Sequence, residues 1–322
     1  MDNFEKSMKN MFVSEAFERA HHRRKEPDWL AMRMRAPGSL FVPVLESKIL
    51  VDNGDVAGPV YLNWEQLRDH VEGDAAFFLG EEKGNAYFAV DLDEKTAAAL
   101  EHRGRFRDLR AVAPLLSQDE GALLAYAKTL IYWHKRNHFC GVCGSRNETR
   151  DGGHFLACVN PECGAFHFPR TDPTIIVLIK RGERCLLGRQ HIWPERMHSV
   201  LAGFVEPGES AEGAVSREVF EEVGLRVRNI RYHSSQPWPF PCSLMLGFTA
   251  EAENELISLG DEELEEANWF GRRELIEAIE KGAVKLPTPI SISYRLIEDW
   301  FDSDGTLRLQ DLAGRQSSLR KE

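Results

Sequence analysis

The stretch "GFVEPGESAEGAVSREVFEEVGL", residues 203–225, carries three glutamates at helical spacing. Glu218, Glu221 and Glu222 share one face of a helix, where neighbouring like charges repel by roughly 0.2–0.5 kcal/mol per pair. They also lie in the half of the helix where the dipole disfavours anions. A bound divalent cation would remove this repulsion, and carboxylate oxygens suit Mg²⁺ or Mn²⁺. The pattern indicates a metal-assisted attack of water on a phosphoryl group, with a merely acidic surface helix as the alternative.

Local signals fix the limits of this helix. Pro207 and Gly208 favour a turn, Ser210 is a suitable N-cap, and Gly224 is a suitable residue to end the helix. The sequence therefore predicts a helix over residues 210–223, preceded by a glycine-containing loop.

Four of the six cysteines lie close together as Cys140-x2-Cys143 and, after fourteen further residues, Cys158-x4-Cys163. Two short pairs separated by a spacer of hairpin length can supply the four thiolates of a tetrahedral zinc site. Free or redox-active cysteines are the alternative. Four thiolates leave no position for a catalytic water, so we expect one structural Zn²⁺ per chain.

The segment "SQPWPFPCS", residues 235–243, alternates three prolines with large side chains. Such a segment suits neither a helix nor a central strand. Trp238 and Phe240 offer flat faces that could stack on a nicotinamide or an adenine, and the prolines would reduce the entropy lost on fixing them. A loop that packs on the core and a polyproline ligand for another protein are the alternatives.

The glutamate stretch resembles the Nudix box, G-x5-E-x7-R-E-U-x-E-E-x-G-U, at every fixed position. The matching residues are Gly203, Glu209 and the run from Arg217 to Leu225. This resemblance implies a Nudix α/β/α sandwich with a mixed sheet, in which the box forms a loop–helix–loop. It also implies hydrolysis of a nucleoside diphosphate linked to another moiety.

The proline segment is similar to the S-Q-P-W-P-F-P-x-S signature of the NADH pyrophosphatase subfamily, whose members include NAD-capped RNA hydrolases. It begins ten residues beyond Leu225, as in that subfamily, which also carries a four-cysteine zinc ribbon. The resemblance implies hydrolysis of NAD(H) to NMN(H) and AMP, with removal of NAD caps from RNA 5′ ends as a further activity. It also implies a homodimer. ADP-ribose or another dinucleotide is the alternative substrate, and a non-catalytic binder of nucleotide or RNA is the third hypothesis.

The same resemblance implies roles for individual residues. Glu218, Glu221 and Glu222 would be catalytic. The Mg²⁺ or Mn²⁺ ligands would be Ala202 through its carbonyl, Glu218, Glu221, Glu222 and Glu263. Glu209 and Arg217 would brace the loop through an ion pair. The substrate contacts would be Phe168, Phe204, Gln236, Pro237, Trp238, Pro239, Phe240, Pro241, Cys242, Ser243 and Ser293.

Two positions depart from the subfamily. Phe168 stands where relatives often have a tyrosine, so stacking would survive but a hydroxyl contact would not. Gly153 lies near the place of an acidic substrate contact. Arg110 could contact a phosphate.

These residues require an α+β or α/β framework in several parts. We expect a small α+β domain over residues 1–118, a connecting helix over 119–138, the zinc ribbon over 139–169, the Nudix domain over 170–302 and a polar, frayed tail over 303–322. Strand-like runs in the first part cover residues 39–52, 59–64 and 86–92. An apolar stripe predicts a helix over 118–137, and β-branched residues predict a strand over 172–182 with a hairpin partner at 184–190.

The formal net charge of −11 argues against broad binding to nucleic acid, although it permits a contact with one RNA end. The chain has no long apolar run and no secretory signal at its first residues, so we expect a cytoplasmic protein that does not enter a membrane.

Overall fold

A computed structural model of the protein describes residues 1–54, 58–69, 76–260, 263–305 and 307–312. The chain divides into two compact units. The N-terminal unit comprises residues 12–171 and 237–242, and the C-terminal unit comprises residues 1–11, 172–236 and 243–322. Both units contain helices and strands, which confirms the mixed class expected from the sequence.

The N-terminal unit is built on a five-stranded sheet and a separate three-stranded sheet. Its elements are η1 Arg23–Lys25, α2 Pro27–Met34, β1 Ser39–Leu45, β2 Lys48–Val51, α3 Trp64–Leu67, β3 Ala76–Glu82, β4 Asn85–Asp91, α4 Glu94–Ala99, β5 Arg105–Arg107, α5 Leu109–Val112, η3 Ala113–Leu115, α6 Gln118–Arg136, β6 Asn147–Arg150, η4 Asp151–Gly153, β7 Phe155–Cys158 and β8 Phe166–His167.

The five-stranded sheet has the order β3-β4-β1-β2-β5, with β1 and β4 parallel. Phe41 on β1 and Phe88 on β4 are register partners whose rings stack with centroids 5.3 Å apart. Helix α6 packs on this sheet, and its predicted apolar stripe is buried. Ser117 caps the helix by accepting from the Glu120 backbone N–H. The helix predicted over 118–137 is therefore confirmed.

The strand predicted over residues 59–64 is wrong. Only isolated bridges occur at Pro59 and Leu62, and helix α3 begins at Trp64. Asn63 explains the difference, because its side chain accepts from the Gln66 backbone N–H at 3.1 Å while Gln66 Oε1 accepts from the Asn63 N–H at 2.9 Å. This reciprocal cap ends the strand-like run at Asn63 and starts a helix at its last residue.

The C-terminal unit contains a six-stranded mixed sheet with the order β12-β13-β9-β10-β14 and β11 beside β9. Its elements are α1 Asn3–Met8, β9 Asp172–Arg181, β10 Arg184–Gln190, β11 Leu201–Phe204, α7 Ala211–Val223, β12 Val227–Trp238, β13 Ser243–Ala252, β14 Leu264–Gly271, α8 Arg272–Glu280, α9 Ile292–Phe301 and η5 Asp302–Asp304.

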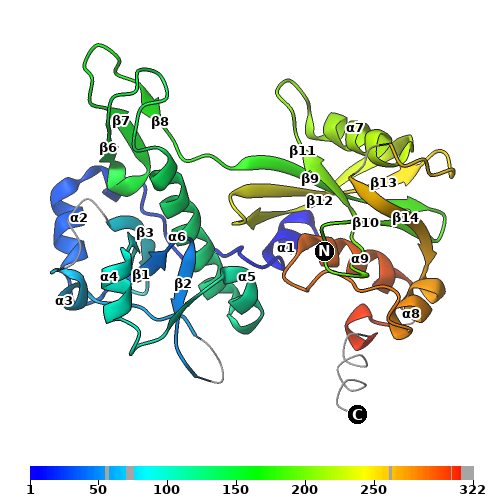
Figure 1. Cartoon of the computed structure of the whole chain (residues 1–322), viewed down its shortest axis with the longest axis horizontal. Helices are drawn as coiled ribbons and strands as arrows, with labels where there is room; N and C mark the ends of the chain where they lie inside the picture. Colours follow the sequence, from blue (N-terminus) through cyan, green and yellow to red (C-terminus); the bar gives the residue numbers. More distant parts are fainter. Residues whose placement is uncertain (55–57, 70–75, 261–262, 306, 313–322) are drawn as a thin grey trace. The chain divides into compact units, whose positions relative to one another are not determined.

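Strand β9 is the centre of this sheet. It runs parallel to β13 and antiparallel to β11, and alternate residues Ile175, Val177 and Ile179 pack in one core with the apolar face of α7. Helix α9 covers the opposite face of the sheet (Figure 1). The unit is therefore an α/β/α sandwich. The strand predicted over 172–182 is confirmed. Its hairpin with β10 is confirmed but covers only two residue pairs, because β11 pairs with much of the rest of β9.

The tail expected to be frayed is partly packed. Leu309 and Leu312 are buried, and the Leu309 backbone N–H donates to Asp302 at 2.9 Å. Residue 306 and residues 313–322 lie outside the described part of the chain.

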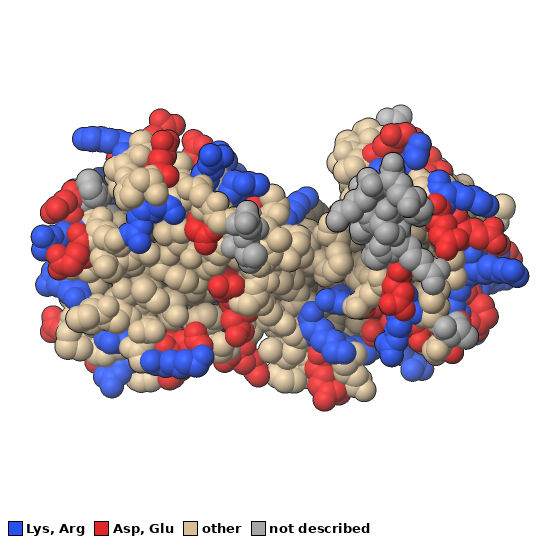
Figure 2. Space-filling view, turned by 90° about the horizontal axis from the view of Figure 1, so that it is seen from below, with Lys and Arg blue, Asp and Glu red and all other residues tan. Residues whose placement is uncertain are grey.

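Acidic and basic side chains are interspersed on the surface that Figure 2 displays. Within the residues that the structure describes, no helix has the length and apolar character needed to cross a membrane.

Candidate active site

Helix α7 presents the three glutamates at different depths. Ser210 accepts from the Gly213 backbone N–H at 3.0 Å, and Gly224 ends the helix with a left-handed backbone, as predicted. The side chain of Glu221 is 51% exposed and that of Glu218 is 15% exposed, whereas Glu222 is only 2% exposed. One helix face therefore offers an open, a shielded and a buried carboxylate.

Arg217 ties the loop before α7 to the helix. Its guanidinium contacts both oxygens of Glu209, with Nε–Oε1 at 2.7 Å and Nη2–Oε2 at 2.9 Å, and Nη2 also donates to the Phe204 carbonyl at 2.9 Å. These hydrogen bonds lower the pKa of Glu209 to about 2. Nη1 donates to Glu218 at 2.9 Å and Glu221 at 3.0 Å. The arginine thus offsets the repulsion between two of the glutamates and fixes the loop.

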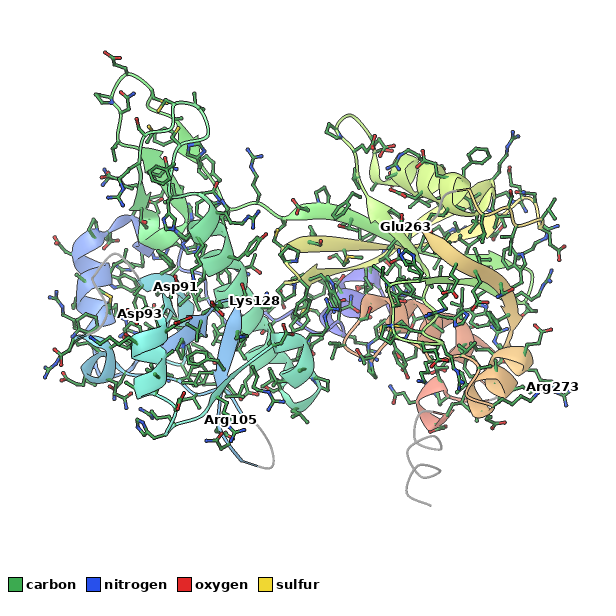
Figure 3. All side chains as sticks on the ribbon, in the orientation of Figure 1. Asp91, Asp93, Arg105, Lys128, Glu263 and Arg273 are labelled. Carbon is green, nitrogen blue, oxygen red and sulfur yellow. The ribbon has the colours of Figure 1, made fainter. Side chains whose placement is uncertain are left out.

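Gly203 makes room for the Glu218 carboxyl group. A Cβ atom at position 203 would lie 2.0 Å from Glu218 Cδ, so any larger residue would displace this carboxylate. Burial, together with the charges of Glu221 and Glu263, raises the pKa of Glu218 although Arg217 opposes the shift. Glu263, just before β14, accepts from Gln190 Nε2 at 2.6 Å (Figure 3). The structure therefore brings Glu263 into the electrostatic neighbourhood of Glu218.

Helix α7 offers carboxylate oxygens, the ligand type that Mg²⁺ and Mn²⁺ prefer, and the missing Cβ of Gly203 leaves room for that of Glu218. Among the residues that the structure describes, these carboxylates do not form a group whose oxygens all lie within 4.8 Å of one another. Ala202 precedes this glycine on β11, where it pairs with Ile176 of β9. The neighbouring Phe204 is 60% exposed, so its ring is available to a ligand.

The four predicted cysteines come together in the N-terminal unit. The sulfur atoms of Cys140, Cys143, Cys158 and Cys163 all lie within 4.8 Å of one another, and among the described residues they form the only such group of potential metal ligands. Two of these separations are 3.8 Å and 3.4 Å. A tetrahedral site with Zn–S bonds of about 2.3 Å would place its sulfurs about 3.8 Å apart. The group therefore fits a zinc ion.

Both cysteine pairs sit on matching turns. Gly144 and Gly164 directly follow the second cysteine of each pair, and both have positive φ angles. The Val142 backbone N–H donates to Cys140 Sγ at 3.4 Å, and His167 Nε2 lies 3.3 Å from the same sulfur. Hydrogen bonds from Ser145 lower the pKa of Cys143 to about 6, which favours its thiolate, whereas burial raises the pKa of Cys158 to about 12.

The proline segment spans both units along the chain. Gln236 belongs to the C-terminal unit, where it is fully buried. Its Nε2 donates to the Ile290 carbonyl at 2.7 Å and the Met11 carbonyl at 2.9 Å, and its Oε1 accepts from the Ile292 N–H at 2.8 Å. This amide therefore fixes the end of β12 through backbone contacts.

Residues 237–242 belong to the N-terminal unit. The rings of Trp238 and Phe240 pack edge-to-face with centroids 5.1 Å apart, and Phe12 meets them edge-on at 6.2 and 6.0 Å. The Arg110 guanidinium lies 4.5 Å from the Phe240 centroid and 5.5 Å from that of Trp238. Both rings are half-buried, so this aromatic cluster is braced and still accessible.

Lys128 holds the backbone of the same segment. Its ammonium donates to the Pro239 carbonyl at 2.8 Å and lies 5.2 Å from the Phe240 centroid. Burial lowers the pKa of this lysine. A buried lysine with a carbonyl partner therefore fixes the tip of the segment to helix α6.

The remaining predicted substrate residues are placed separately. Phe168 is exposed beside Phe155 in the N-terminal unit. Ser293 and Ser243 are buried in the C-terminal unit, where Ser293 Oγ lies 2.7 Å from Ser199 Oγ. Pro237 and Pro241 are exposed, and Cys242 is half-buried.

Comparisons with known proteins agree with this geometry. Residues 169–288 match the NUDIX domain, and residues 38–133 match the NADH pyrophosphatase-like rudimentary NUDIX domain. An NAD-capped RNA hydrolase from Macaca fascicularis is 32% identical, in a match that covers 90% of this chain and 73% of the relative. One from Mycobacterium bovis is 38% identical over 275 residues, which cover 82% of this chain and 86% of the relative. The chain belongs to the Nudix hydrolases that carry an NADH pyrophosphatase-like domain.

A crystal structure of a NUDIX hydrolase from Nitrosomonas europaea is also similar to this Nudix hydrolase. It has a TM-score of 0.42 and 22% identity, and the match covers 53% of this chain and 94% of that one.

In this Nudix hydrolase, the roles of three residues around the aromatic segment do not follow from the sequence. They are Phe12, Arg110 and Lys128. The sequence predicts only a phosphate contact for Arg110 and gives no role to Phe12 or Lys128. One signal was available for Lys128, because it falls within the apolar stripe of α6, between Leu124 and Ile131. A lysine on a buried face needs a specific partner, and here that partner is Pro239. Phe12 and Arg110 carry no comparable local signal.

Proposed function

We propose that this Nudix hydrolase cleaves the pyrophosphate bond of NAD(H) to NMN(H) and AMP, and that it cleaves the same bond in the NAD cap of RNA. The support is a complete Nudix box followed by the braced Trp238–Phe240 segment. The similar proteins from Macaca fascicularis and Mycobacterium bovis are both named NAD-capped RNA hydrolases.

Water adds to one phosphorus, the bond from that phosphorus to the bridging oxygen breaks, and a proton reaches the leaving phosphate. Nudix hydrolases use divalent metals; Mg²⁺ or Mn²⁺ would neutralise phosphate charge and lower the pKa of the water. The ligands would be Glu218, Glu221, Glu222, Glu263 and the Ala202 carbonyl. Glu222 or the adjacent Glu221 would orient the water and accept its proton.

The other parts of the site would position these groups. Arg217 and Glu209 would hold the loop, so that the Ala202 carbonyl keeps its place when the substrate binds. Trp238, Phe240, Phe204 and the exposed Phe168 would offer ring faces to the substrate. The other predicted substrate residues would fix the segment and the backbone near it, as the buried amide of Gln236 does at one end.

We further propose one structural Zn²⁺ per chain on the four cysteines, which would stabilise the ribbon without entering the reaction. The five-part division of the chain, a homodimeric assembly and a cytoplasmic location remain proposals that accompany this function.

The decisive experiment compares kcat/KM for NADH, NAD⁺, ADP-ribose and a short NAD-capped RNA, with Mg²⁺ and with Mn²⁺. We expect the nicotinamide-containing substrates to exceed ADP-ribose by about tenfold or more, since stacking of a base on an aromatic side chain contributes roughly 1–3 kcal/mol. Equal or higher efficiency with ADP-ribose would contradict the proposed substrate and favour the alternative. Among NADH, NAD⁺ and the NAD-capped RNA, the substrate with the highest kcat/KM identifies the preferred reaction.

A further inference from the structure

A cavity of about 600 Å³ lies within the N-terminal unit, away from the box glutamates, the cysteine cluster and the aromatic segment. It is lined by α2 and η1 on one side, by the sheet on another and by the turn at η4. Its apolar lining, called the apolar wall below, includes Leu30, Met34 and Phe78, and its cationic lining includes Arg24, Lys25 and Arg35. Its mixed lining suits a ligand with both an anionic and an apolar part.

The cavity is cationic although the whole chain carries a net charge of −11. Within the described ranges, neither Lys25 nor Arg35 forms an ion pair, and the Arg35 guanidinium lies 6.0 Å from the Trp64 ring centroid. A fourth cation, Arg150, pairs with Glu148, and Asp151 is the only acidic residue in the lining. The lining therefore carries a positive charge that the described part of the protein does not neutralise.

Arg24 is the most unusual residue of this lining because it is only 8% exposed. Its Nε donates to the Arg19 carbonyl at 2.9 Å, and the guanidinium forms no ion pair with any residue that the structure describes. Burial lowers its pKa and nearby Arg19 acts in the same direction, whereas Tyr126 and Asp151 oppose the shift. A buried charge without a direct ion pair is costly, so an anion in contact with this guanidinium would be stabilised.

We propose that this cavity binds a phosphate ester through Arg24, Lys25 and Arg35, with the apolar wall beside the attached group. Guanidinium groups match phosphate oxygens in charge and in planar geometry. Two sources share this chemistry: a free mononucleotide, such as the AMP that the proposed reaction releases, and a nucleotide within an RNA strand. The site does not depend on the proposed hydrolysis, because its residues lie outside the Nudix box and the aromatic cluster.

Isothermal titration calorimetry of the full, zinc-containing chain at fixed ionic strength and without added divalent metal tests this site. The probes are inorganic phosphate, AMP and a ten-nucleotide RNA with a 5′-hydroxyl group. Arg24→Met removes the buried guanidinium, and Arg105→Met is the matched control, since Arg105 is exposed on β5 of the same unit and does not line the cavity (Figure 3).

We expect Arg24→Met to weaken phosphate and AMP binding by about tenfold or more, the effect of losing a charge-assisted hydrogen bond, while Arg105→Met binds like the wild type. Tighter binding of AMP than of RNA would identify a mononucleotide site, and the reverse would identify a strand site. A wild-type chain that binds none of the probes at millimolar concentration, or an Arg24→Met variant that binds as tightly, would overturn the proposal.

A second variant guards against misfolding of Arg24→Met. Lys25→Met combined with Arg35→Met changes only exposed side chains and should weaken phosphate binding in the same direction. All these variants should hydrolyse NADH at the wild-type rate. Loss of anion binding with intact hydrolysis supports the second site, and absence of hydrolysis in the wild type contradicts only the proposed function.

Discussion

Glu222 differs from its neighbours because its carboxyl group is almost fully buried at the C-terminal half of α7. Glu222→Gln keeps the shape of the side chain and removes its charge. If Glu222 holds the metal or accepts the proton, turnover of NADH should fall by about 10²- to 10⁴-fold with little change in KM. Steady-state kinetics with saturating Mg²⁺ measures both constants.

The control for this change is Glu212→Gln, at an exposed position in the first turn of the same helix. It should retain wild-type kinetics. Near-normal turnover of Glu222→Gln would rule out its proposed role in the metal site.

Two histidines give the N-terminal unit a predictable response to acid. The His134 ring stacks on Phe77 with centroids 3.7 Å apart, and its Nε2 donates to the Gly153 carbonyl at 2.8 Å. Burial lowers the pKa of His134 to about 4, and burial followed by the charge of Arg24 lowers that of His154 to about 3. Both rings are therefore neutral in the folded chain under conditions that protonate them in the unfolded chain.

The contribution of these histidines to the free energy of unfolding should consequently be complete above pH 6.5. It should decline as the pH falls toward 4, because only the unfolded state then binds the extra protons. The slope would be about 1.4 kcal/mol per pH unit for each histidine. His134→Gln keeps an N–H donor but does not titrate. The slope of its unfolding free energy against pH should therefore be smaller by about 1.4 kcal/mol per pH unit, the contribution of one proton. Urea denaturation of both proteins between pH 4.5 and 7 measures this, and equal slopes would contradict the assignment.

At the scale of elements, helix α6 determines where the aromatic segment lies. Lys128 holds the Pro239 carbonyl, and Phe12 and Arg110 brace the rings. If this placement serves nicotinamide recognition, Lys128→Met should raise KM for NADH about tenfold while leaving KM for ADP-ribose and kcat nearly unchanged. Trp238→Ala should show the same selectivity, and its increase in KM for NADH is the reference with which the Lys128 variant is compared.

Lys135→Met is the matched control, because Lys135 lies on the same helix but pairs with Asp91 at 2.9 Å. It should leave both KM values unchanged. Equal increases for NADH and ADP-ribose in the Lys128 and Trp238 variants would show that the segment has only a structural role.

The elements that the sequence predicted correctly are those with local signals. Helix α7 has its cap at Ser210 and its end at Gly224, and the cysteine turns depend on residues a few positions apart. The features that the sequence did not predict involve distant partners, and the one wrong strand involves a competing local signal. Nothing near β9 indicates that β11 and β13 flank it, and the cap at Asn63 outweighed the strand-like composition of residues 59–64. The position of residues 237–242 in the N-terminal unit likewise depends on contacts more than a hundred residues away.

At the scale of the whole molecule, the two proposed metal sites belong to different units and should respond differently to chelation. The cysteines lie in the N-terminal unit and the box glutamates in the C-terminal unit. Closed four-thiolate sites stabilise folding, whereas carboxylate sites exchange their metal readily.

Removal of zinc with a thiophilic chelator should therefore lower the melting temperature by about 10 °C or more, because the folding free energy of the ribbon is linked to metal binding. The Mg²⁺ concentration for half-maximal activity should not change in the molecules that stay folded. Thermal melts and Mg²⁺ titrations before and after chelation, with elemental analysis of the purified protein, test this separation.

Cys143→Ser should lose zinc, and Cys242→Ser, which alters a half-buried cysteine outside the cluster, should keep one zinc per chain. Purified wild-type protein that contains no zinc, or a melting temperature that chelation leaves unchanged, would show that the four cysteines do not form a structural metal site.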